Sequence, residues 1–357
     1  MDNYTASPED EYDVLIEDDL DSSEMDPVLT PKFLSDQQVL QICCTVFAMG
    51  LLTNALAVFI LVRYKGFKNV WNIYLLNLAL SSVCFLLPLP FWAHTAAHGE
   101  SPGNGTCKVL VGLHSTGLYS ETLFNIVLLM QGYKVFSQAR LASIFTKVPS
   151  SVAISVLAWV TALVLALPEA VFYQLQMESQ KHKCAFGKPH FLLIEEPFWK
   201  HFLTLKMNIL VLGFPLVVFI FCCGQMRKVQ AFRERQNDLR KLAFVTMGVF
   251  LLMWAPYNIV LLLSQFQEHL SLQDEKNSSR LDASIQVAQL VAATHCCLNP
   301  LICLLLDKAF ASYLCSLFPR CNDAPFQSGG DSHRAAPRGG RDQPIELYSS
   351  LHQRQDT

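Results

Sequence analysis

Seven long apolar runs set this chain apart from an ordinary water-soluble domain. A helix of about 20 apolar residues crosses the roughly 30 Å hydrocarbon core of a bilayer, and seven runs reach that length. Of the 357 residues, 52% are hydrophobic and only 16% are charged, which is too apolar for a typical soluble protein. The runs cover approximately residues 39–63, 71–93, 107–133, 152–172, 200–226, 241–266 and 283–306.

The runs are predicted to be helices, because backbone groups inside a bilayer must hydrogen-bond within their own segment. Neither Val39–Val62 nor Leu242–Leu263 contains a charged residue, whereas Lys108, Glu121 and Lys206 interrupt the third and fifth runs. The alternative is a soluble helical protein with buried helices, and seven such runs argue against it. The sequence therefore predicts an all-α membrane protein, a bundle of seven transmembrane helices.

Basic residues predict the orientation, because loops rich in Lys and Arg stay in the cytosol. The three basic loops follow the first, third and fifth runs. If these loops lie in the cytosol, the N-terminus lies outside the cell. We expect a plasma-membrane protein with an extracellular, disordered, acidic tail over residues 1–38 and a transmembrane domain over 39–306. A short cytoplasmic amphipathic helix over 307–321 and a disordered cytoplasmic tail over 322–357 complete the prediction. Because no long apolar run precedes Val39, we expect no cleaved signal peptide.

The N-terminal segment is strongly acidic. Residues 1–36 hold twelve acidic residues and one lysine, and the rest of the chain has 18 acidic and 26 basic residues, a net charge of +8. The segment is either a solvated tail or a surface that attracts a basic protein ligand, since such a field raises encounter rates. The candidate ligand contacts in it are Tyr4, Asp10, Glu11, Tyr12 and Asp13. Sulfation of these tyrosines would add negative charge.

Two of the twelve cysteines are expected to form a disulfide. Cys107 and Cys184 both fall on the predicted extracellular side, where the environment is oxidising. Most of the others lie inside the runs and are interpreted as small apolar packing residues. We predict no metal site at "THCC", because the adjacent cysteines Cys296 and Cys297 would point about 100° apart on a helix.

Three sequons and two cysteines are candidate modification sites. Asn3, Asn104 and Asn277 each begin an Asn-X-Ser/Thr sequon on the predicted outer side, so we expect glycosylation there. Cys315 and Cys321 follow the seventh run on the inner side and are candidates for palmitoylation.

Local motifs carry a family resemblance over approximately residues 39–320. The chain contains "GLLTNALAVFILV", "IYLLNLALSS", "LPLPFWAH", "VLAWVTALVLALPE", "MWAPYN" and "ATHCCLNPLI". Together with the seven runs, these motifs resemble the rhodopsin-like G-protein-coupled receptors. The resemblance is narrowed to chemokine receptors by "LPLPFWAH" and "THCCLNP". It is narrowed further, to atypical members of that family, by "EDEYDVLIE", "KHKCAF" and "FWKHFLTLKMNI". The resemblance implies that the chain binds chemerin, with C-C chemokines as further ligands, without ordinary G-protein signalling. It also implies heteromers with other chemokine receptors.

Measured against this family, the inner end of the third run is altered. Signalling members carry Asp-Arg-Tyr where this chain has Gln131, Gly132 and Tyr133. The family's arginine meets the G protein, and its aspartate restrains that arginine at rest. Glycine has no side chain that could donate hydrogen bonds. The alternative is a tolerated variant in a receptor that still signals through other contacts.

Three further positions also lack residues that signalling members of the family carry. Cys303 replaces the tyrosine of Asn-Pro-X-X-Tyr after Asn299, and Cys223 replaces the tyrosine of the fifth helix. A thiol is a weaker donor than a phenol, and shorter. Ser82 replaces the acid of the second helix, whereas Trp254 is retained.

Glu121 introduces a carboxyl group into the third run. Glu121 and Asn125 are four residues apart and share a helix face. By the resemblance, this face looks toward Ser82, His295 and Asn299. We predict that Glu121 supplies the acid that the second helix has lost, either as a neutral hydrogen-bonded group or as the ligand of a sodium ion. No other cofactor is expected.

The resemblance also places the ligand pocket at Trp92, His114 and Gln289. Gln289 stands where the family usually has a glutamate, and Cys43 stands where it has a tyrosine. A pocket without its acid would leave most of the binding to the tail and the outer loops.

The leading hypothesis is a receptor that does not signal through G proteins and presents a captured protein ligand to signalling receptors, with a role in leukocyte recruitment and inflammation. The alternatives are a signalling C-C chemokine receptor and a scavenger that internalises its ligand. A transporter or membrane enzyme is disfavoured by the odd number of helices and by the lack of a convergent catalytic set. Binding of nucleic acid is not expected.

Overall fold

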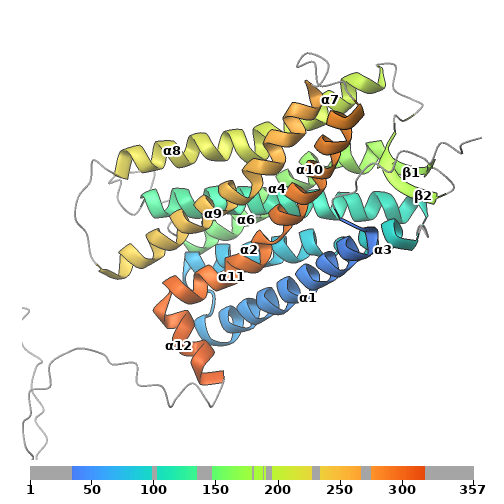
Figure 1. The fold of residues 1–357 in the computed structure, drawn as a ribbon. Coiled ribbons are helices and arrows are strands. Elements are labelled where there is room, and N and C mark those ends of the chain that lie inside the picture. Colours follow the sequence, from blue (N-terminus) through green and yellow to red (C-terminus); the bar gives the residue numbers. More distant parts are fainter. Residues whose placement is uncertain are drawn as a thin grey trace, which may run out of the picture.

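The computed structural model describes residues 34–98, 103–134, 147–178, 181–187, 189, 195–226, 234–266 and 275–317, which form a bundle of long helices with one short β-hairpin (Figure 1). The first four helices are α1 (Asp36–Ile60, extended by a π-helical turn, η1, Leu61–Lys65), α2 (Val70–Leu86), α3 (Leu89–His98) and α4 (Asn104–Lys134). The others are α6 (Val148–Phe172), α7 (Glu196–Met207), η2 (Asn208–Gly213), α8 (Phe214–Met226), α9 (Glu234–Gln265), α10 (Glu275–Ala293), α11 (His295–Leu306) and α12 (Lys308–Leu317).

Six helical segments in the described part of the chain are long and apolar enough to cross a membrane. They are Asp36–Lys65, Val70–Thr95, Val148–Phe172, Glu196–Gln225, Asp238–Gln265 and Arg280–Leu306. Many of their large apolar side chains point outward, and Leu252 and Leu305 are 72% and 80% exposed. Such exposure is expected of a surface that faces lipid.

α4 is the seventh long helix, and it lies inside the bundle. It has 31 residues, enough to span a bilayer at 1.5 Å per residue. It packs against α2, α6, α8 and α9, and Leu118, Phe124 and Leu129 on it are almost fully buried. Because α4 faces protein more than lipid, it tolerates Glu121 and other polar residues, which explains why its sequence is less apolar than the other spans.

Two predicted helices are interrupted, which corrects the sequence-based boundaries. The run 71–93 is divided at Leu87 and Pro88 into α2 and α3, and proline favours such a break because it has no N–H to donate. The run 283–306 starts earlier than predicted, at Glu275, and is divided at Thr294 into α10 and α11.

A two-stranded antiparallel sheet was not predicted from the sequence. β1 (Tyr173–Glu178) pairs with β2 (Lys181–Phe186), and the register runs from Tyr173 opposite Phe186 to Glu178 opposite Lys181. The hairpin follows α6 and lies at one end of the bundle, close to α3 and opposite the end that carries α12 (Figure 1). The chain is therefore all-helical within the spans and not throughout.

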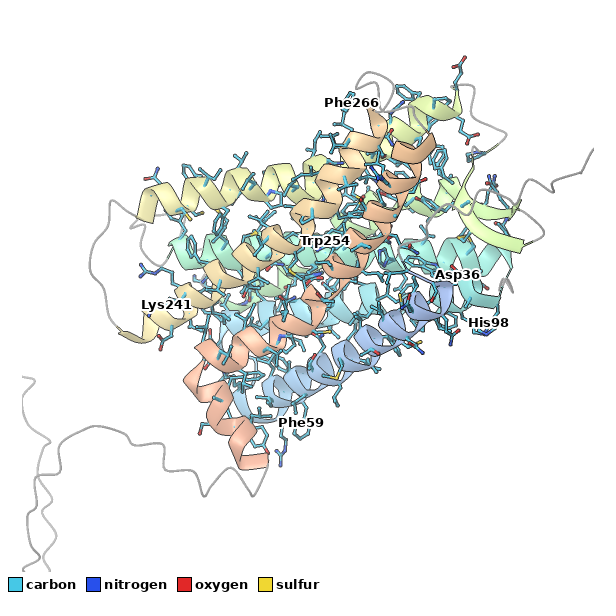
Figure 2. The ribbon with its side chains drawn as sticks, viewed as in Figure 1. Asp36, Phe59, His98, Lys241, Trp254 and Phe266 are labelled. Carbon is cyan, nitrogen blue, oxygen red and sulfur yellow. A yellow bond between two sulfur atoms is a disulfide. The ribbon has the colours of Figure 1, made fainter. Side chains whose placement is uncertain are left out.

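Local contacts define the two ends of the bundle. Ser35 caps α1 and forms a capping box with Gln38. At the other end, Lys65 pairs with Asp307, where the chain leaves α11, and the rings of Tyr64 and Tyr313 stack at 5.2 Å. Figure 2 shows Asp36 and His98 at the hairpin end, and Phe59 and Lys241 at the α12 end. The predicted amphipathic helix over 307–321 is observed as α12, and residues 318–321 lie outside the described part.

Candidate functional site

The carboxyl group of Glu121 is the centre of a polar cluster in the middle of the bundle. Glu121 Oε1 lies 2.6 Å from Asn299 Nδ2, 2.8 Å from His295 Nε2 and 3.3 Å from Ser82 Oγ. Glu121, His295 and Ser82 have no exposed surface, and Asn299 is 4% exposed. The structure thus brings together the four residues that the resemblance placed on facing helices, from α2, α4 and α11.

His295 lies in a cage of aromatic rings. The rings of Phe85, Phe250 and Trp254 have centroids 5.9, 5.5 and 5.6 Å from that of His295, all at steep angles to it. The second ring nitrogen, Nδ1, lies 2.6 Å from the carbonyl oxygen of Ala292. His295 is the first residue of α11, so the break at Thr294 determines where this ring is held.

Two asparagines extend the cluster. Asn125 donates from Nδ2 to the Glu121 carbonyl oxygen at 3.1 Å, and its buried Oδ1 has no hydrogen-bond partner among the described residues. Asn54 of α1 donates to the carbonyl oxygens of Gly50 at 2.8 Å and Cys296 at 2.9 Å, and so links α1 to α11.

The inner end of α4 is packed closely against its neighbours. Gln131 and Gly132 are buried, and a Cβ added to Gly132 would lie 3.5 Å from Ala243 Cβ and 3.6 Å from the Trp71 ring. Tyr133 is half-buried, with its ring 6.0 Å from that of Phe221. The positions of the family's charged residues are therefore occupied by a buried amide and by a glycine that leaves room between the helices for about one methyl group.

The two cysteines that replace tyrosines differ in their surroundings. Cys303 is 7% exposed and lines a small cavity of about 10 Å³, roughly the space of one water molecule. Asn54, Asn299 and Phe310 also line it. Cys223 of α8 is half-buried and interacts with a neighbour. Neither thiol can reproduce the reach of a phenol.

Two of the three predicted pocket residues are in one aromatic group near the hairpin end. The ring of His114 lies 4.1 Å from that of Phe85 and 4.6 Å from that of Trp92, and His114 Nδ1 lies 3.1 Å from the Phe85 carbonyl oxygen. Gln289 lies half-buried on α10, and Cys43 is buried on α1. His114 is thus continuous, through Phe85, with the cage around His295.

A second buried charge cluster was missed from the sequence. Glu169 of α6 accepts a hydrogen bond from Tyr119 Oη at 2.5 Å and pairs with Lys206 Nζ at 2.7 Å. Lys206 also donates to the Leu165 carbonyl oxygen at 2.7 Å and lies 5.1 Å from the Tyr119 ring centroid. Burial, followed by the nearby Glu169 carboxylate, raises the pKa of Tyr173 at the start of β1. The available signal was Lys206 itself, because a charge in an apolar run needs a partner.

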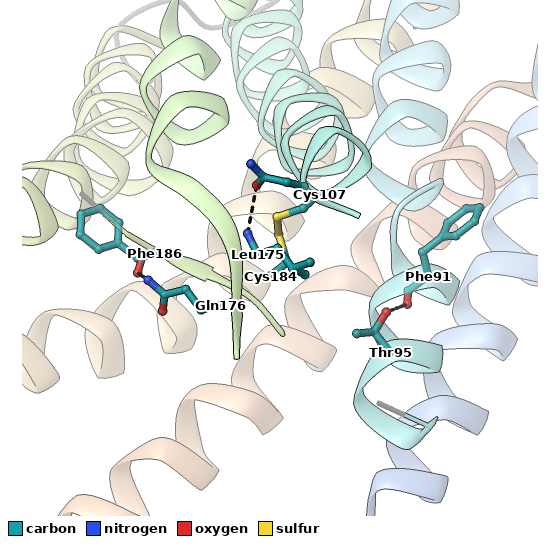
Figure 3. The surroundings of a disulfide bond; sticks show 8 residues. Phe91, Thr95, Cys107, Leu175, Gln176, Cys184 and Phe186 are labelled. Atoms are coloured by element: carbon teal, nitrogen blue, oxygen red, sulfur yellow. Dashed lines mark hydrogen bonds between the residues drawn. A yellow bond between two sulfur atoms is a disulfide. The ribbon is translucent and has the colours of Figure 1, made fainter. Parts of the chain in front are cut away.

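The disulfide expected between Cys107 and Cys184 is present (Figure 3). It joins the first turns of α4 to β2 across a sequence separation of 77 residues. Asn104 Oδ1 accepts a hydrogen bond from the Leu175 N–H at 3.1 Å, so the same end of α4 also holds β1. The hairpin is thereby attached to α4 through both strands.

Some of the predicted modification and ligand-binding residues lie within the described part of the chain and others lie outside it. Asn104 lies within it and is exposed at the start of α4. Asn277 lies in the first turn of α10 rather than in a loop, because that helix starts eight residues earlier than predicted, and Cys315 lies in α12. The following candidates fall outside the described part: Asn3, Tyr4, Asp10, Glu11, Tyr12, Asp13 and Cys321.

One group of potential metal-binding atoms occurs within the described residues. Single donor atoms of Glu121, His295 and Cys296 all lie within 4.8 Å of one another. Cys296 Sγ lies 3.7 Å from both Glu121 Oε2 and His295 Nε2. Cys297 points elsewhere, toward the Val46 carbonyl oxygen, as expected for adjacent helical residues.

Comparisons with known proteins agree with this architecture. Residues 53–302 match the family described as 7 transmembrane receptor (rhodopsin family). The chain is 72% identical to "C-C chemokine receptor-like 2" of Mus musculus over all of this chain and 99% of that protein. It is 51% identical to the Homo sapiens protein of the same name, over 97% and 100%, and 54% identical to "Chemokine C-C motif receptor-like 2" of Bos taurus, over 90% and 94%. The chain therefore belongs to the rhodopsin family of seven-transmembrane receptors, in the chemokine receptor-like group to which these relatives belong.

Proposed function

We propose that the chain captures a protein ligand at the cell surface without activating a G protein, and holds that ligand for signalling receptors on neighbouring cells. The proposed ligand is chemerin, with C-C chemokines as further ligands. The proposal places the N-terminus outside the cell, at the plasma membrane. It gives the protein a role in leukocyte recruitment and inflammation.

The observation that carries the proposal is the inner end of α4. Gly132 is buried between Trp71 and Ala243, and beside it stands the neutral, buried side chain of Gln131. No arginine is present at this position to meet a G protein, and no aspartate to restrain one. A glycine contributes only backbone there, so the interaction most specific to a signalling state is missing.

The other altered positions support the same conclusion. A water-bridged pair of phenols needs two long side chains with strong donors, and this chain has the thiols of Cys223 and Cys303. Trp254 remains fully buried against Phe250 and His295, and Pro256 remains inside α9. The bundle thus retains the residues around which α9 could bend but lacks the groups that would stabilise a bent, G-protein-binding form.

The outer side supports ligand capture through electrostatics. The twelve acidic residues of the first 36 would attract a basic protein, and such attraction mainly raises the association rate. Gln289 offers the pocket an amide instead of a carboxylate, and Glu169 is already paired with Lys206. Attraction by the tail together with a weakly charged pocket favours holding a ligand over responding to it.

The decisive experiment measures GDP release from heterotrimeric G protein by the purified full chain in lipid nanodiscs, with and without chemerin. We expect no increase over empty nanodiscs, while a signalling chemokine receptor in the same assay supplies the positive control. Robust exchange would disprove the proposal. Labelled chemerin on cells then separates presentation from scavenging, because a presented ligand stays accessible to protease after warming and an internalised one does not.

A further inference from the structure

The protons of His295 can be assigned from its hydrogen-bond partners. Nδ1 lies 2.6 Å from the Ala292 carbonyl oxygen, which can only accept, so Nδ1 carries a proton. Nε2 lies 2.8 Å from Glu121 Oε1, so one more proton lies between these two atoms. Either a cationic ring donates it to a carboxylate, or a neutral ring accepts it from a carboxylic acid.

The other neighbours of Glu121 favour the first arrangement. Oε1 also accepts from Asn299 Nδ2 at 2.6 Å and lies 3.3 Å from Ser82 Oγ, so three potential donors converge on one oxygen. An ionised carboxylate oxygen accepts several hydrogen bonds, whereas a carboxylic acid hydroxyl would use the same oxygen to donate. Two short contacts and a longer one, all to Oε1, fit an anion better than a carboxylic acid.

Three aromatic rings surround His295. The centroids of Phe85, Phe250 and Trp254 all lie within 6 Å of that of His295, each ring steeply inclined to the imidazole, and a ring at this distance stabilises a cation when it presents its face to it. Both His295 and Glu121 have no exposed surface. A buried charge needs a partner of opposite sign, and each of these residues provides one for the other.

We propose that His295 is the built-in cation of this core: its imidazolium balances Glu121, and the pair links α4 to α11 where the seventh span breaks. The core then needs no bound metal ion to neutralise its acid. This inference is independent of whether the receptor signals or only captures ligand. It replaces the sodium ion considered from the sequence with a residue of the chain itself.

If His295 is replaced by a neutral residue, Glu121 becomes a buried anion without a partner of opposite charge. Ser82 Oγ lies 3.3 Å from Glu121 Oε1, and the amide oxygen of a glutamine at position 295 would supply a second neutral oxygen. Oxygen ligands around a carboxylate suit a small hard cation. Removing the internal cation should therefore create a sodium site that the unmodified protein does not have.

The test compares unfolding temperatures of the purified full chain in NaCl and in an equal concentration of N-methyl-D-glucamine chloride. The unmodified chain should unfold at the same temperature in both. His295→Gln should unfold at a lower temperature without sodium and recover about 3–6 °C when sodium is added. His295→Gln/Glu121→Gln should lose the sodium response, and His94→Gln, which changes an exposed histidine, should behave like the unmodified chain.

Three results would overturn the proposal. The first is a sodium response of the unmodified chain that Glu121→Gln removes, because the core would then hold an ion with a neutral His295. The second is a His295→Gln variant that folds and shows no sodium response. The third is stabilisation of the unmodified chain by micromolar Zn²⁺ that Cys296→Ser abolishes, since that would assign the cluster to a metal.

A spectroscopic measurement makes the test independent of variants that fail to fold without sodium. The infrared difference spectrum between the unmodified chain and Glu121→Gln reports the protonation state of this one side chain. The proposal expects the loss of carboxylate bands. Loss of the carbonyl band of a protonated carboxylic acid would contradict it.

Discussion

Gly132 of α4 and Ala243 of α9 face each other where the two helices meet, with 3.5 Å between the Ala243 Cβ and the place a Cβ would take on Gly132. Gly117, nearer the N-terminus of the same helix, has much less space around it. A Cβ there would lie 2.7 Å from the Phe85 Cα and 2.9 Å from the Cys84 carbonyl carbon, both backbone atoms of α2. Gly132 therefore has room for a methyl group, whereas Gly117 does not.

This difference predicts opposite effects of the same substitution. Gly132→Ala should stabilise the protein by up to about 1 kcal/mol, because alanine favours the helix and the methyl group makes ordinary contacts. Gly117→Ala should destabilise it by about 1–3 kcal/mol, because α2 and α4 must move apart. Thermal unfolding in detergent measures both, and equal shifts for the two variants would contradict the packing described here.

Restoring the arginine alone should not restore signalling. Gly132→Arg replaces one of several altered groups, while Gln131, Cys223 and Cys303 remain as they are. We expect GDP release to stay at background for Gly132→Arg and to rise only when Gln131→Asp, Cys223→Tyr and Cys303→Tyr are added. Nucleotide exchange in nanodiscs measures this. Full activity of the single variant would show that the other three positions do not matter.

The buried pair of Lys206 and Glu169 should behave as a unit. Both side chains are 11% exposed, so Lys206→Met leaves a carboxylate without its partner and should cost about 3–5 kcal/mol of stability. Lys206→Met/Glu169→Gln should recover most of the loss, because a neutral amide can still accept from Tyr119. The unfolding temperatures of the two single variants and the double variant form the measurement. A double variant as unstable as Lys206→Met would show that packing of the lysine, not its charge, is what matters.

The disulfide should hold the β-hairpin against the start of α4. Cys184→Ser removes a link across 77 residues of sequence, and loss of such a link typically costs about 2–5 kcal/mol. We expect less protein at the cell surface and weaker binding of chemerin. Cys297→Ser, in the seventh span and outside the disulfide, is the matched control and should leave both quantities near their original values.

The acidic tail should act on the rate of binding more than on dissociation. Replacing Asp10, Glu11 and Asp13 with Asn or Gln removes three negative charges from the segment. The association rate of chemerin should fall severalfold at low salt, and the difference from the unmodified chain should shrink as salt rises. Surface plasmon resonance over a range of NaCl concentrations measures both rates. An unchanged association rate would argue that the tail is only a solvated extension.

The sequence predicted the spans well, because hydropathy reports which residues can face lipid. It predicted helix ends less well where helices continue beyond the membrane. α10 starts at Glu275 in a polar segment that hydropathy treats as a loop. The break before α3 had a signal in Pro88 and Pro90, but prolines also occur inside intact spans, as Pro256 does in α9.

The polar core was foreseen in part. Glu121 and Asn125 share a face by spacing alone, and the family resemblance supplied the facing residues Ser82, His295 and Asn299. The aromatic cage could not be foreseen, because it depends on how α2 and α9 approach the break at Thr294. The same is true of Lys206 and Glu169, whose contact depends on which helices are neighbours.

The missing side chain at Gly132 has a thermodynamic consequence for the outer surface. Coupling between two sites is reciprocal: a partner inside the cell can change the affinity of a ligand outside only as far as the ligand changes the affinity of that partner. With no arginine at this position, a G protein would have little means of altering the affinity for the ligand. If the chain captures a chemoattractant as proposed, that affinity would not change with the nucleotide state of the G protein, which suits a surface that stores its ligand.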